Sequence, residues 1–144
     1  MSQEGQLKID LVIPVYNEAG VVEQTYAIIA NVIDCLPYTF TIYYVDDGSQ
    51  DSTVDSLNAL AGRDPRIIVL EFARNFGHQA ALTAGLDASN GDFVISLDGD
   101  GQHPPEMIPQ MIALFEQGYD IVQTQRIEEG QGLSFKQLTS SGFY

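Results

Sequence analysis

Short apolar runs alternate along the chain with stretches in which apolar residues recur every three or four positions. A short apolar run between polar residues is typical of a buried strand, and the longer spacing is typical of an amphipathic helix. The runs predict strands at Leu7–Val15, Phe40–Val45, Arg66–Leu70, Phe93–Leu97 and Asp120–Gln125. The recurring positions predict helices over Val21–Leu36, Val54–Leu60, His78–Ala88 and Glu106–Gln117. Strand alternating with helix predicts an α/β fold with a mostly parallel sheet and helices on both faces.

Polar clusters follow three of these strands directly. They are Tyr16-Asn17-Glu18, Asp46-Asp47 and Asp98-Gly99-Asp100. In open parallel sheets, ligands bind outside the carboxyl ends of the strands. The pattern therefore predicts a ligand site at that edge of the sheet.

Composition limits what this ligand can be. The chain has 144 residues, 44% of them hydrophobic, which suits one domain with a modest core. Six Lys and Arg face twenty Asp and Glu, for a formal charge of -14. Nucleic acid is disfavoured as a partner, because phosphate backbones are held by clustered basic residues. A nucleotide diphosphate would need a bridging cation or local arginines.

The turn Asp98-Gly99-Asp100-Gly101-Gln102-His103 places two carboxylates and an amide oxygen close together. Carboxylates about 4 Å apart repel by ~4 kcal/mol at an effective dielectric of 20, and a bound cation relieves that conflict. Hard oxygen ligands of this kind suit Mg²⁺ or Mn²⁺. The alternative is an acidic surface turn, or a chance likeness to a calcium loop.

The other polar positions leave their alternatives open. Asp46 and Asp47 could accept hydrogen bonds from a base and a ribose, or stabilise a turn and the next helix. Arg74 and Arg126 could clamp a phosphate, or pair with surface acids. For His78 and His103, the sequence is compatible both with a structural role and with a role in the site.

The single cysteine, Cys35, and the absence of a signal-peptide pattern lead us to expect a reducing, cytoplasmic location. No run reaches the ~18 apolar residues of a membrane span, so we expect the chain itself to be soluble.

Taken in order, these segments resemble the family-2 glycosyltransferases of the GT-A fold. The resemblance points to their polyprenyl-phosphate hexose synthase branch, which includes dolichyl-phosphate mannose synthase and the bactoprenol glucosyltransferases. The matching strings are VIPVYNE (12–18), VDDGSQDST (45–53), ARNFGHQAALTAGLD (73–87), GD (91–92), LDGDGQHPPE (97–106) and GYDIV (118–122). They extend over nearly the whole chain.

The resemblance implies a role for each matching position. Pro14, Tyr16 and Glu18 would line the nucleoside pocket, with Asp47 on the base and Asp46 on the ribose side. Asp98, Asp100 and Gln102 would hold Mg²⁺ or Mn²⁺ on the donor diphosphate. Arg126 would lie near the phosphates, although Gln123-Thr124-Gln125 before it departs from the usual run of small residues.

The implied reaction is inverting, metal-dependent transfer of a hexose from a UDP- or GDP-linked donor to a polyprenyl phosphate. Such an acceptor is already anionic and needs no strong general base. The alternatives are a family-2 transferase acting on a saccharide hydroxyl and a non-catalytic nucleotide-sugar-binding module. A more distant one is a haloacid-dehalogenase-type phosphatase with Asp98 as nucleophile, which requires the motif after the first strand and a downstream lysine at the phosphate.

The resemblance also implies a division of the chain. Residues 1–127 would form the donor-binding domain, and 128–144 would begin an acceptor and membrane-interface region. Phe135-Lys136 and Ser140–Tyr144 resemble the start of interfacial helices. Because relatives continue past Tyr144, we expect a fragment that keeps the donor pocket and lacks full transferase activity. The full-length protein would lie at the cytoplasmic face of a membrane, and its oligomeric state is left open.

Overall fold

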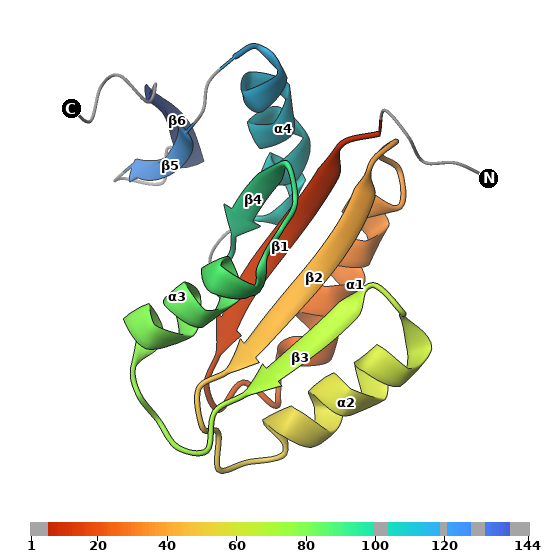
Figure 1. The fold of residues 1–144 in the computed structure, drawn as a ribbon, viewed down its shortest axis with the longest axis vertical. Coiled ribbons are helices and arrows are strands. Elements are labelled where there is room, and N and C mark those ends of the chain that lie inside the picture. Colours follow the sequence, from red (N-terminus) through yellow and green to blue (C-terminus); the bar gives the residue numbers. More distant parts are fainter. Residues whose placement is uncertain (1–5, 100–103, 119–120, 128–131, 139–144) are drawn as a thin grey trace. The chain divides into compact units, whose positions relative to one another are not determined.

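The computed structural model describes residues 6–99 and 104–118, together with the backbone of 121–127 and 132–138. The chain divides into two compact units, Met1–Glu106 and Met107–Tyr144 (Figure 1). The division into a donor domain (1–127) and an acceptor region (128–144) stays a prediction.

The first unit is built on a four-stranded parallel sheet. Its strands are β1 (Lys8–Val15), β2 (Thr39–Asp46), β3 (Ile67–Glu71) and β4 (Phe93–Ser96), in the order β3-β2-β1-β4. The central pair β1 and β2 runs in register from Lys8↔Thr39 to Val15↔Asp46. Because all four strands are parallel, their carboxyl ends meet at one edge, as the sequence predicts.

Three helices cover the two faces of this sheet: α1 (Val22–Ile33), α2 (Thr53–Arg63) and α3 (His78–Ala88). The chain moves one way from β1 through β2 to β3, and then returns past β1 to reach β4. Because parallel crossovers are right-handed, the return places α3 on the face opposite to α1 and α2. Figure 1 shows α3 in front of the sheet and α1 behind it. The predicted α/β class with helices on both faces is confirmed.

Along β1, the buried side chains of this unit point alternately to the two faces of the sheet. Val12 and Val45 are fully buried and pack with Ala81 of α3. Leu11 and Ile13, on either side of Val12 in β1, are also buried. They point to the opposite face of the sheet, because successive side chains of a strand alternate between its faces. At Gly85 of α3, an added Cβ would lie 2.3 Å from Val12 Cγ1, so only a glycine permits this close helix-to-sheet approach.

One buried carboxylate fixes the start of β4 against β1. Asp10 is 2% exposed, and its Oδ2 accepts hydrogen bonds from the N–H groups of Asn90 (2.8 Å) and Gly91 (2.7 Å).

Replacing Asp10 with alanine leaves both N–H groups without this acceptor, and we expect a loss of about 1–3 kcal/mol in the free energy of unfolding. Urea titration measures this loss. Asp92→Ala, at an exposed acceptor of the Lys8 N–H, is the matched control and should cost much less. Equal losses would contradict the assignment.

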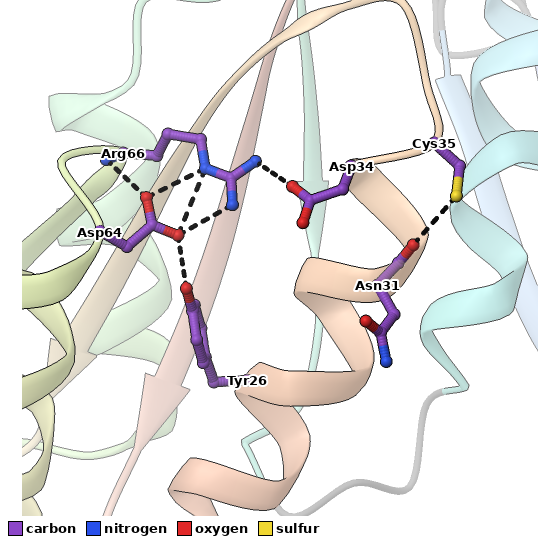
Figure 2. Close-up of polar contacts among 6 residues, drawn as sticks. All are labelled: Tyr26, Asn31, Asp34, Cys35, Asp64 and Arg66. Carbon is purple, nitrogen blue, oxygen red and sulfur yellow. Dashed lines mark hydrogen bonds and ion pairs between the residues drawn. The ribbon is translucent and has the colours of Figure 1, made fainter.

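A polar cluster joins α1 to the segment between α2 and β3 (Figure 2). Asp64, 6% exposed, accepts hydrogen bonds from the Arg66 guanidinium (2.8 Å) and the Tyr26 hydroxyl (2.5 Å). Arg66 also reaches Asp34, the C-cap of α1, at 2.8 Å. A carboxylate at a helix C-terminus is unfavourable, and the arginine compensates for it. This cluster lies at the amino end of β3, away from the edge where the strands finish.

A short 3₁₀ turn (Pro105–Met107) spans the boundary between the two units. The second unit contains α4 (Ile108–Glu116) and the strands β5 (Ile121–Ile127) and β6 (Gly132–Leu138). The two strands pair antiparallel, with Arg126 opposite Leu133. The predicted fifth strand exists, but its partner is β6 and not the parallel sheet. The expected interfacial helix at Phe135-Lys136 is wrong, because both residues lie in β6. Ser140–Tyr144 lies outside the described residues.

None of the helices in the described part of the chain is long and apolar enough to cross a membrane.

Candidate functional site: the carboxyl edge of the parallel sheet

The strand order creates a crevice at the carboxyl edge. The chain leaves β1 toward β2 on one side, whereas β4 occupies the other side of β1. At such a reversal of strand order the connecting segments separate, which opens a ligand crevice at the strand ends. The residues that follow β1 and β4 lie at this reversal.

A first cavity of about 360 Å³ lies there. Its walls come from β1 and the segment after it, from the ends of β2 and β4, and from the start of α3. They consist of Pro14, Val15, Tyr16, Glu18, Asp47, His78, Asp98 and Gly99. Five of the predicted site residues, Pro14, Tyr16, Glu18, Asp47 and Asp98, are thus brought together around one space.

A second cavity, of about 420 Å³, lies at the ends of β2 and β3. Tyr16 lines both cavities, and the predicted residues Asp46 and Arg74 line only the second. Its other walls are Gly48, Ser49, Gln50, Asp51, Val54, Glu71, Phe72, Ala73 and Asn75. Most of these residues were not predicted from the sequence to belong to the site. The available signal was their position, since they follow the carboxyl ends of β2 and β3.

The loop after β2 holds the loop after β1 by reciprocal hydrogen bonds. The Asn17 N–H donates to Ser49 Oγ (2.8 Å), and the Gln50 N–H donates to Asn17 Oδ1 (2.9 Å). Asn17 adopts a positive φ of 51°, a conformation that asparagine tolerates better than most residues. The Glu18 N–H donates to Thr53 Oγ1 (2.9 Å), at the first residue of α2. These bonds fix the backbone that carries Tyr16 and Glu18 before any ligand binds.

Asp51 anchors the start of α2 in the same region. Its carboxylate accepts from the Thr53 hydroxyl, the Thr53 N–H (2.9 Å) and the Ala19 N–H (3.5 Å). The hydrogen bond from the Thr53 side chain is the main reason that the pKa of Asp51 is lowered. Ser52, the N-cap residue of α2, makes no side-chain capping hydrogen bond, so Asp51 supplies the carboxylate that holds this end of the helix.

The two aspartates at the end of β2 have different surroundings. Asp47, 4% exposed, accepts from the N–H groups of Phe76 (2.8 Å) and Gly77 (3.2 Å) and from Asn75 Nδ2 (3.0 Å). Both its oxygens therefore hold the loop before α3. Asp46 is 1% exposed, and one oxygen accepts from the Ser49 N–H (3.0 Å). Its Oδ1 is buried and has no hydrogen-bond partner among the described residues.

The turn after β4 lies directly against β1. An added Cβ on Gly99 would lie 2.5 Å from Val15 Cγ1 and 2.8 Å from the Pro14 carbonyl oxygen. Glycine at this position therefore permits the close approach of the turn to β1, and Asp98 beside it lines the first cavity. Asp100 and Gln102, the other predicted metal ligands, lie outside the described residues. Within the described part of the chain, no three His, Cys, Asp or Glu side chains form a group that could hold a metal ion.

The remaining predicted residues are placed less fully. Arg126 lies in β5, in the second unit, and its side chain is outside the described atoms. His78 is the first residue of α3 and lines the first cavity, so the structure places it at the site. His103 lies outside the described residues.

The acidic strand ends of this α/β unit surround a cavity, and comparison with known sequences identifies the family of the chain. The chain belongs to the glycosyl transferase family 2, whose family model matches residues 10–143.

Two curated relatives are close in sequence. The bactoprenol glucosyl transferase of Shigella phage SfV is 40% identical over 138 residues, which cover 96% of this chain and 45% of the relative. The undecaprenyl-phosphate 4-deoxy-4-formamido-L-arabinose transferase of Pseudomonas syringae is 42% identical over 119 residues, which cover 82% of this chain and 35% of the relative. The chain thus spans less than half the length of these relatives.

A solved structure supports the fold. The mannosyltransferase PcManGT from Pyrobaculum calidifontis, in complex with GDP-Man and Mn²⁺, matches 72% of this chain and 30% of its own length, with a TM-score of 0.59 and 23% identity. The GT-A-like architecture predicted from the sequence is confirmed. Family membership removes the phosphatase alternative, and in the sheet Asp98 follows the fourth strand in chain order, not the first.

Proposed function

We propose that this chain is the donor-binding part of an inverting glycosyltransferase that moves a hexose from a nucleotide-diphosphate sugar to a polyprenyl phosphate. The observation that carries the proposal is the pair of cavities at the carboxyl edge of the sheet, which share Tyr16 as a wall. The nucleoside would extend from the first cavity, beside Tyr16 and Asp47, into the second, beside Asp46 and Arg74. The diphosphate and sugar would lie in the first cavity, beside Asp98.

The chemistry of the donor set fits a divalent cation. Glu18, Asp47 and Asp98 give the first cavity an acidic lining, and a diphosphate entering it would be repelled. Oxygen donors of this kind suit Mg²⁺ or Mn²⁺. We propose that Asp98, with Asp100 and Gln102, holds the ion, which would act as a Lewis acid on the leaving diphosphate. PcManGT, solved with Mn²⁺, supports this view.

The reaction needs placement more than proton transfer. An oxygen of the acceptor phosphate attacks the anomeric carbon, the bond from that carbon to the donor diphosphate breaks, and the configuration inverts. Since the acceptor oxygen is already anionic, no residue has to remove a proton from it. The fixed loops after β1 and β2 would hold the donor in line. The names of the two relatives, which refer to bactoprenol and undecaprenyl phosphate, support this acceptor class.

The full-length protein would work at the cytoplasmic face of a membrane, where lipid phosphate and soluble nucleotide sugar meet. The proposed acceptor is tested by measuring transfer of labelled hexose from UDP- or GDP-sugars to undecaprenyl phosphate by that protein. Nucleotide binding without any transfer would favour a non-catalytic binding module, and transfer only to a saccharide would favour the hydroxyl-acceptor branch.

Donor binding is testable on this chain by calorimetry and thermal unfolding with UDP and GDP, in Mn²⁺ and in EDTA. We expect one of the two nucleotides to bind in Mn²⁺. At a hundred times its dissociation constant, a ligand stabilises by about 2.7 kcal/mol, or roughly 5–10 °C in Tm for a chain of this size. Asp98→Asn should weaken binding in Mn²⁺ at least about tenfold, because a metal ligand is lost.

Asp87→Asn is the matched control, since it removes the same charge from an exposed position of α3 that lines neither cavity. It should bind as the wild type does. No binding of either nucleotide by the wild type would refute donor binding, and undiminished binding by Asp98→Asn would refute its role at the metal.

A further inference from the structure

Arg74 differs from the other two arginines of the first unit. Arg63 and Arg66 pair with carboxylates, as expected in a chain with twenty acids and six basic residues. Arg74 is exposed, and it has no carboxylate partner among the residues that the structure describes. Glu71 lines the same cavity but does not form an ion pair with Arg74. Its guanidinium carbon instead lies 4.3 Å from the centre of the Phe76 ring.

Phe76 is itself exposed, at 54%, yet it is held in place. Its N–H donates to Asp47 Oδ1 at 2.8 Å, which fixes its backbone to the end of β2. Its ring makes an edge-to-face contact with Phe72, with the centres 5.6 Å apart and an interplanar angle of 87°. Phe76 is therefore a large apolar side chain that is exposed to solvent and held in a fixed position by two contacts, so its ring can support a neighbouring side chain.

The two cavities separate the roles of these residues. Arg74 and Phe72 line the second cavity, whereas Phe76 belongs to the described lining of neither. A ligand in the second cavity could therefore contact the guanidinium without touching the Phe76 ring.

We propose that Phe76 is a positioning residue that holds the Arg74 guanidinium at the second cavity, where it meets an oxygen acceptor of a bound nucleoside diphosphate. This inference rests on the proposed donor site. A stacked guanidinium keeps its donors in the plane of the fork and is ordered before binding, so less conformational entropy is lost when a ligand arrives. Asp47 contributes to the same arrangement by fixing the Phe76 backbone.

The test is a double-mutant cycle, with affinity for UDP and GDP measured by calorimetry in Mn²⁺. Phe76→Leu should bind the preferred nucleotide roughly two- to fivefold more weakly, the size of an exposed cation–π contact. Phe76→Tyr keeps an aromatic face and should bind as the wild type does. Arg74→Ala should weaken binding further, and adding Phe76→Leu to it should have no effect, because the residue acts through Arg74.

Leu86→Ala, at another exposed apolar residue (45%), controls for the loss of surface hydrophobicity. Melting temperatures check folding, and Phe76→Met provides a second substitution if Phe76→Leu is unstable. Additive effects would overturn the inference, because the ring would then contact the ligand itself. Unchanged binding by Phe76→Leu would overturn it too. If the wild type binds neither nucleotide, the proposed donor site fails first and the inference fails with it.

Discussion

Replacing Gly48 with alanine should destabilise the first unit by about 2–5 kcal/mol. Gly48 has φ +76°, and an added Cβ would lie 2.3 Å from the Arg74 carbonyl carbon and 2.4 Å from the Asn75 nitrogen. The positive φ costs an L-residue roughly 1–2 kcal/mol, and overpacking against a neighbour costs typically 1–3 kcal/mol more. The obstructing atoms are backbone, so no side-chain rotation relieves the clash. Urea unfolding measures the loss.

Two other glycines separate the two causes. Gly77 has φ +105° but open space around it, so Gly77→Ala should show only the cost of the backbone conformation. Gly62, inside α2, has open space and no positive φ, and Gly62→Ala should stabilise by about 0.5–1 kcal/mol. If Gly48→Ala costs no more than Gly77→Ala, the close approach of the two loops does not contribute to stability.

The same close approach shows why part of the site could not be predicted from the sequence. The pattern predicts that Asp47 ends a strand, and it leaves open whether the carboxylate binds a ligand or supports a turn. In the structure, that carboxylate holds Asn75, Phe76 and Gly77, which lie 28–30 residues further along the chain. A contact between distant segments leaves no local periodicity, and only the folded sheet brings the two loops together.

The strand ends were predictable for a physical reason. Parallel topology follows from alternating strand and helix, and it brings the ends of β1, β2 and β4 to one edge. Five predicted residues accordingly line one cavity. The roles of Asp100, Gln102 and Arg126 stay predictions, because their side chains lie outside the described part.

The second unit contains a sequence pattern that is typical of a strand. Leu133 and Phe135 alternate with Ser134 and Lys136, a period of two that favours a strand. The resemblance to interfacial helices led to the opposite expectation. The segment forms β6, which pairs antiparallel with β5.

The polar cluster around Asp64 should make a large electrostatic contribution to the stability of the first unit. The side chain of Asp64 is 7% exposed and that of Arg66 is 30% exposed, so truncating one of the two leaves the charge of the other poorly solvated. Removing one member of a buried pair costs 3–5 kcal/mol, and the partial exposure of Arg66 places Asp64→Ala near the lower limit, about 3 kcal/mol. Arg63→Ala is the control. It breaks an exposed pair with Glu23 at 3.7 Å and should cost less than about 1 kcal/mol.

The pH dependence of this contribution follows from the direction of the pKa shift. The hydrogen bond from Arg66 is the main reason that the pKa of Asp64 is well below its ordinary value, with the Tyr26 hydroxyl adding to the effect. A carboxylate with a lowered folded-state pKa stabilises the fold fully above its unfolded pKa, about 4, and loses that stabilisation as the pH falls toward the folded value. The difference in unfolding free energy between wild type and Asp64→Ala should therefore be constant from about pH 6 to 8 and shrink below about pH 4. Urea unfolding at pH 7, 5 and 3 measures it. A difference that does not shrink at pH 3 would show that the ionised carboxylate is not its source.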